Sequence, residues 1–74
     1  MSVVRVPGYA VAEIVLDPAR GFGRPIFARG GACVAEALGM FLAGERLHVV
    51  AEEYGVPTDH LEDAVRVELA ARMP

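Results

Sequence analysis

Three arginines in a glycine-rich stretch are the residues of this sequence best suited to binding an anion. Arg20, Arg24 and Arg29 lie within ten residues of one another, and all seven basic residues of the chain are arginines. Guanidinium groups form forked hydrogen bonds with phosphates, and neighbouring glycines let the backbone approach a phosphate closely. We therefore predict that any DNA-backbone contact involves Arg20, Arg24 and Arg29. The alternative is a solvated loop in which these arginines pair with local carboxylates.

Other chemistry-bearing residues form weaker patterns. Gly21-x-Gly23 lacks the third glycine of a dinucleotide fingerprint and opens no helix. His48 and Glu52 are four residues apart, but a zinc site needs a third and a fourth ligand. Cys33 has no histidine near it in sequence, which favours a buried structural cysteine over a nucleophile. We expect no catalytic residues, no metal site and no cofactor, and hence a protein that is not an enzyme.

The charge is divided unevenly between the two halves of the chain. Residues 1–31 carry four arginines and two acids, a net charge of +2, whereas residues 32–74 carry three arginines and eight acids, a net charge of -5. A field of several like charges attracts ligands of the opposite sign. An anion-binding surface is therefore expected in the first half.

Length and hydrophobicity point to a partner. A chain of 74 residues buries a small core, yet 54% of its residues are hydrophobic. The surplus favours association, most simply as a homodimer. The lone Cys33 excludes an internal disulfide, the apolar runs are too short for a membrane helix, and no signal peptide is evident. We expect a cytoplasmic protein.

The first 31 residues have the pattern of short strands and a loop. Residues 3–6 are a β-branched run that ends at Pro7-Gly8, and residues 9–16 are a second apolar run that ends at Asp17-Pro18. The glycines of residues 19–31 predict a loop with room for one brief strand at 25–28.

Three helices are predicted in residues 34–72. Val34, Leu38, Phe41 and Leu42 form one helical face that ends before Gly44. Residues 47–54 form a second helix, which Gly55 terminates. A third helix is predicted to begin at Thr58, whose hydroxyl caps it. Its buried face consists of four apolar residues, Leu61, Ala64, Val65 and Leu69.

The second and third helices have the spacing of a helix-turn-helix. A small residue, Ala51, precedes the turn glycine by four positions, and Val56, Leu61 and Val65 can fill the wedge between the helices. We predict one α+β domain over residues 1–74, with short N-terminal strands or a hairpin followed by a three-helix core. An ordinary helical hairpin without DNA explains the same residues equally well.

Several motifs resemble those of domain-of-unknown-function family 433, a family of VapB-like antitoxins. The resemblance spans about residues 13–70 and includes an Ile-x-x-Asp-Pro strand end, a Gly-x-Pro loop, a Leu-x-Gly helix end and a Glu-Tyr-Gly turn. These features fall on Ile14, Asp17, Pro18, Gly23, Pro25, Leu42, Gly44, Glu53, Tyr54 and Gly55. The chain departs from the commonest pattern at residues 28–31, Ala-Arg-Gly-Gly, where Gly-Thr-Arg is usual.

The resemblance implies strands packed on a helix-turn-helix core, self-association and pairing with a PIN-like ribonuclease toxin. The acidic start of the third helix, which we expect to expose Asp59, His60, Glu62 and Asp63, disfavours it as the DNA reader. Surplus apolar positions on the helices predict a dimer or toxin interface. They are Ala37, Met40, Val49, Val67 and Ala70. The function expected is that of an antitoxin that binds its ribonuclease and operator DNA; the alternative is a dimerisation or protein-interaction domain with no nucleic-acid role.

Overall fold

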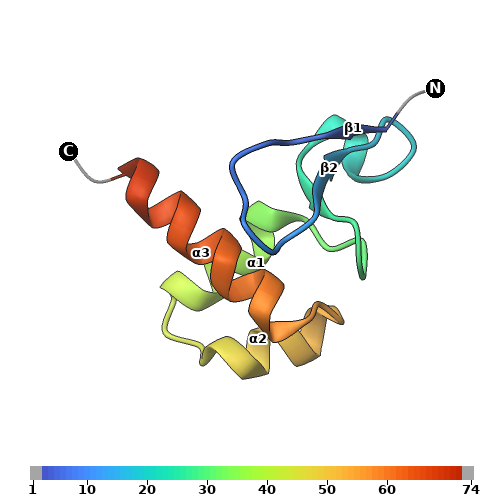
Figure 1. Ribbon diagram of the computed structural model, residues 1–74. Helices are drawn as coiled ribbons and strands as arrows, with labels where there is room; N and C mark the ends of the chain where they lie inside the picture. The colour runs from blue at the N-terminus through green and yellow to red at the C-terminus, as the bar shows by residue number, and fades with distance from the viewer. Residues whose placement is uncertain (1–2, 73–74) are drawn as a thin grey trace.

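A small antiparallel sheet is followed by three helices, as expected for the α+β class (Figure 1). The computed structural model describes residues 3–72. The strands are β1 (Val4–Arg5), β2 (Ile14–Leu16) and β3 (Ile26–Phe27), and a short 3-10 turn, η1 (Gly21–Gly23), lies between β2 and β3. The helices are α1 (Val34–Leu42), α2 (Leu47–Tyr54) and α3 (Thr58–Arg72). None of the helices in this part of the chain has the length and apolar character needed to cross a membrane.

The sheet has the order β1-β2-β3, so β2 is the central strand. Val4 lies opposite Leu16, and Ile14 lies opposite Phe27. Directly opposed residues project to the same face of a sheet, and residues two apart share that face. Ile14 and Phe27 are completely buried against the helices. The same face continues outward to Leu16 and Val4, where Val4 is exposed.

The second strand is shorter than the predicted run 9–16. The backbone N–H groups of Val11 and Ala12 both donate to Oδ2 of Asp63, each at 2.8 Å, and so have no strand partner. In Figure 1 the loop between β1 and β2 descends from the sheet to the middle of α3. A contact fifty residues away along the chain therefore ends the strand early.

The helix boundaries follow the sequence closely. Gly55 ends α2 in the left-handed conformation, with φ at 68°, as predicted. The Thr58 cap is wrong, because Thr58 is already helical and the carbonyl of Pro57 accepts the first helical bond, from Leu61 N–H at 3.1 Å. The carboxylate of Asp59 accepts from the N–H of His60 and satisfies one of the first-turn donors.

The hydrophobic core lies between one face of the sheet and the three helices. Val50 and Leu61 are almost completely buried, as the periodicity predicted. On α1, Val34 and Leu38 are buried as predicted, but Phe41 is only half-buried, Leu42 is 48% exposed, and Ala37, which was expected at the surface, is completely buried. The buried residues of α1 are Val34, Ala37 and Leu38, so burial is concentrated in its first turns and declines toward the end of the helix.

The turn after β3 meets the turn between α2 and α3. Gly30 has a φ of 95°, and a Cβ at this position would lie 2.6 Å from the carbonyl oxygen of Gly55. Only a residue without a side chain allows the two backbones to approach this closely. This close approach joins the sheet half to the turn between α2 and α3.

A candidate partner-binding groove

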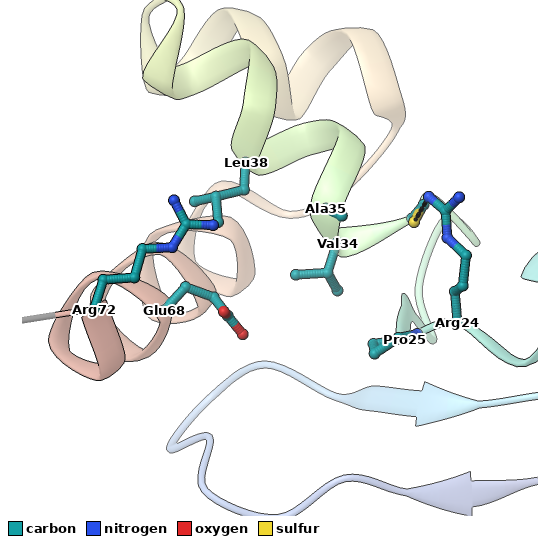
Figure 2. A pocket seen from close by; sticks show the side chains of 8 residues that line it. Arg24, Pro25, Val34, Ala35, Leu38, Glu68 and Arg72 are labelled. Atoms are coloured by element: carbon teal, nitrogen blue, oxygen red, sulfur yellow. Dashed lines mark hydrogen bonds between the residues drawn. The ribbon is translucent and has the colours of Figure 1, made fainter.

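A groove lies between α1, α3 and the loop before β3, with a volume of about 290 Å³. Figure 2 shows α1 above it, α3 on one side and the loop on the other. Val34, Leu38 and Pro25 give it an apolar lining, and Arg24 and Arg72 lie at its opposite ends. Its complete lining is Arg24, Pro25, Cys33, Val34, Ala35, Leu38, Glu68 and Arg72. An apolar floor between two guanidinium groups suits a partner segment that carries both apolar and acidic side chains.

Glu68 is held in place by a tyrosine from the β1–β2 loop. The hydroxyl of Tyr9 donates to Oε1 of Glu68 at 3.0 Å. Burial, and after it this hydrogen bond to a carboxylate, raises the pKa of Tyr9 to about 12. The phenol therefore stays protonated at physiological pH and keeps donating. Tyr9 thus fixes one wall of the groove from outside it.

Arg24 forms the other end of the groove together with Cys33. Its Nη2 donates to Cys33 Sγ at 2.8 Å. This hydrogen bond, the neighbouring sulfur and then Glu36 raise the pKa of the Arg24 guanidinium. Cys33 is the residue immediately before α1 and is half-buried rather than buried as predicted. The groove keeps an oriented, permanently charged arginine at this end.

The three loop arginines have different surroundings. Arg20 Nε donates to Oδ2 of Asp17 at 3.0 Å. The N–H of Ala19 and then the Arg20 side chain lower the pKa of Asp17, so this carboxylate stays charged and offsets Arg20. Arg29 is exposed next to the Gly30 turn. The structure therefore places Arg24 in the groove and Arg20 on a carboxylate, so the alternative of local carboxylate pairing holds for Arg20.

The predicted apolar interface is only partly available. Ala37 is completely buried in the core of its own chain and offers no surface to a partner. Met40, Val49 and Val67 are half-buried, and Ala70 is exposed. The apolar periodicity of α1 did not show that Ala37 belongs to the core of its own chain.

The start of α3 differs from the prediction at two residues. His60 is buried, with its Nδ1 unpartnered, and Asp63 is bound to the backbone of residues 11 and 12. Asp59 and Glu62 are exposed as expected, and Glu62 forms an ion pair with Arg66 at 3.4 Å. The solvent face of α3 is therefore mostly acidic in its first two turns.

Within residues 3–72, no group of three or more histidine, cysteine, aspartate or glutamate side chains is close enough to hold a metal. His48 and Glu52 are exposed on α2. The sequence did not indicate the groove residues Pro25, Glu68 and Arg72.

A search of known proteins finds a close relative. Over 64 residues, 86% of its length, the chain is 47% identical to a Mycobacterium tuberculosis (strain ATCC 25618 / H37Rv) protein named "Putative antitoxin VapB45". The chain is homologous to part of that protein. The match covers 27% of the relative, so the chain spans about a quarter of the relative's length.

A solved structure shows the same fold. The crystal structure of Rv2018 from Mycobacterium tuberculosis matches with a TM-score of 0.81 and 47% identity, over 86% of this chain and 30% of that one. No protein-family model matches the chain. Membership of domain-of-unknown-function family 433 therefore stays a prediction, while the fold is shared with the mycobacterial protein.

Proposed function

We propose that this chain is an antitoxin module that binds and neutralises a ribonuclease toxin and has no catalytic activity of its own. The observation that carries the proposal is the 47% identity to the antitoxin-named relative over 86% of the chain. An identity of this size extends to the surface as well as the core. The PIN-like character of the toxin comes from the resemblance to the VapB-like family.

The groove between α1 and α3 is the site we assign to the toxin. Its floor is apolar, and Arg24 and Arg72 can each form a forked bond with a carboxylate of the partner. The half-buried side chains of Met40, Val49 and Val67, together with the exposed Ala70, extend the apolar surface on the helices. An acidic and apolar segment of the ribonuclease fits this combination.

The first part of the test asks whether a gene beside this one encodes a ribonuclease, and the second follows RNA cleavage by that enzyme as the chain is added. Ala35 is exposed and lines the groove, so Ala35→Trp fills the groove without disturbing the core. Ala71→Trp, on an exposed position of α3 outside the groove lining, is the matched control. We expect the wild type and Ala71→Trp to inhibit cleavage and Ala35→Trp to inhibit it poorly. Failure of the wild-type chain to inhibit would contradict the proposed function.

We also propose that the chain binds operator DNA through the loop arginines Arg20, Arg24 and Arg29. Replacing Arg20, Arg24 and Arg29 with alanine should weaken binding and reduce the salt dependence, by about one unit of log–log slope for each lost phosphate contact. Replacing Asp59 and Glu62 with neutral residues should leave binding equal or stronger, because like charge is removed. An operator bound no better than random duplex would favour the alternative, a protein-interaction domain without a nucleic-acid role.

A further inference from the structure

Phe22 is a fully exposed aromatic residue in an uncommon backbone conformation. Its relative exposure is 99%, and its φ of 54° lies in the left-handed region. A bulky residue with positive φ is a strained exception, and an exposed aromatic ring gains nothing from folding. Gly21 and Gly23 on either side have positive φ as well. The turn therefore presents the ring to solvent at a conformational cost.

Phe22 borders an apolar hollow at the outer part of the sheet. Its lining is Val4, Leu16, Pro18, Phe22 and Gly23, and its volume is about 430 Å³. Val4 is 54% exposed. None of these residues lines the groove between α1 and α3. This apolar patch is a second, separate surface.

The open edge of the sheet borders the patch. The N–H of Val6 donates to the carbonyl of Ile14 at 2.8 Å, and Val4 opposite Leu16 follows two residues earlier in the same register. In an antiparallel pair the bonded positions alternate, so the N–H and carbonyl of Arg5 point away from β2. Because β1 is the outer strand, these groups face the open edge.

We propose that a second copy of this chain pairs with β1 in antiparallel fashion and joins the two apolar patches. The twofold axis passes beside Val4, which lies opposite the partner's Val4. The outward N–H and carbonyl of Arg5 then form hydrogen bonds with the carbonyl and N–H of the partner's Val3. The twofold axis repeats these two bonds, which gives four backbone hydrogen bonds. Opposed side chains share one face, so Val4, Leu16 and Phe22 of both copies form one continuous apolar surface.

The charges and the prolines select this register. Moving the twofold axis by one residue toward the C-terminus, a register shift of two residues, would place Arg5 opposite the partner's Arg5, where like charges repel. It would also place Val3 opposite the partner's Pro7, which has no N–H to donate. The Val4-centred pairing avoids both conflicts. Arg5 meanwhile keeps its contact with Glu13 at 3.4 Å on the opposite face.

Analytical ultracentrifugation across a concentration series, with the full chain, tests the proposal. We expect a monomer–dimer equilibrium. Phe22→Gly removes the ring and suits the left-handed conformation, so the fold keeps its melting temperature or gains in it. The dimer dissociation constant should rise on the order of tenfold or more, because a large apolar contact is lost. A wild-type chain that stays monomeric at every concentration would overturn the proposal.

A backbone variant tests the edge separately. Arg5→Pro removes the outward N–H while leaving the bonds of Val4 and Val6 to β2 intact, and Arg5→Ala removes the same side chain but keeps the N–H. Dimerisation should be lost in Arg5→Pro and retained in Arg5→Ala. If both variants dimerise equally, or if Phe22→Gly dimerises like the wild type, a different surface joins the copies. If Arg5→Pro has a lower melting temperature than the wild type, the dimer dissociation constant of Phe22→Gly alone tests the proposal. Ribonuclease neutralisation is measured on the same variants, and its loss or retention is independent of these outcomes.

Discussion

The helical half, residues 34–72, and the sheet half, residues 3–33, are held together in different ways. Each helix has its own repeating bonds, and its boundary is set by residues beside it in sequence: Gly55 ends α2, and the carbonyl of Pro57 accepts the first helical bond of α3. The strands are only two or three residues long, and their connecting loop is fixed by side chains of α3. The helical half is therefore specified locally, whereas the sheet half depends on residues some fifty positions away.

The largest effect should come from emptying the core where the two halves meet. Phe27 is completely buried between the sheet and the helices, and Phe27→Ala should cost about 3–5 kcal/mol, which leaves little folded protein for a chain this small. Phe41→Ala is the matched control, because Phe41 is only half-buried and should cost less. Thermal melting compares them. Equal melting temperatures would mean that the sheet contributes little to the core.

Replacing Asp63 should weaken the contact between the sheet half and α3 while leaving the helices intact. Asp63→Asn replaces a carboxylate that accepts two backbone N–H groups with an amide, which accepts with less strength. We expect a loss of about 1 kcal/mol, with faster amide exchange at Val11 and Ala12 than in α2. Glu62→Gln, on the exposed face of the same helix, should change neither the stability nor the exchange rates of Val11 and Ala12. Uniform exchange throughout the chain would contradict a separable sheet half.

Acid should weaken the same contact. The N–H groups of Ala12 and then Val11 lower the pKa of Asp63 below 3.8, so the folded state favours its charged form. A lowered pKa contributes stability that is present above pH 3.8 and is lost as pH falls through the folded value. The melting temperature should therefore decrease as the pH is lowered below about 4. The decrease should be less steep in Asp63→Asn than in the wild type. The pKa of Asp17 is also lowered, so replacing Asp17 as well should reduce the remaining slope further.

The smallest effect concerns Tyr9. Its pKa of about 12, raised by burial and by Glu68, means that the folded state favours the neutral phenol. The corresponding stability is present below pH 10 and is lost as pH rises from 10 toward 12. Ultraviolet titration of Tyr54→Phe, which leaves Tyr9 as the only tyrosine, should give a midpoint near 12, and adding Glu68→Gln should lower it. A midpoint near 10 in Tyr54→Phe would place the ring in water.

The sequence was most informative where structure is local. The spacing of Leu47, Val50 and Ala51 and the glycine after Tyr54 predicted α2 to the residue. It failed where burial depends on a distant element. Apolar residues at 9–12 have the composition of a strand, but Asp63 takes the N–H groups that a strand would need.

The groove illustrates the same division. Arg24 was predicted as a DNA-backbone contact and not as part of a groove, and nothing in the sequence marked Glu68 and Arg72 as its neighbours. Periodicity gives the face of a helix but not its partner, so it could not place these residues beside Val34 and Leu38. For the same reason Ala37 was assigned to an interface, although it is completely buried in the core of its own chain.

The contact between Gly30 and Gly55 has a consequence for how this protein can change during evolution. A Cβ at position 30 would lie 2.6 Å from a backbone oxygen, which no rotamer change relieves. Core positions such as Val50 or Leu61 can exchange among apolar residues of similar volume while neighbours adjust. Position 30 has no such neighbours to adjust, and even alanine forces the two turns apart. Divergent sequences that keep this arrangement of sheet and helices should therefore vary freely in their apolar residues and retain glycine at this one position.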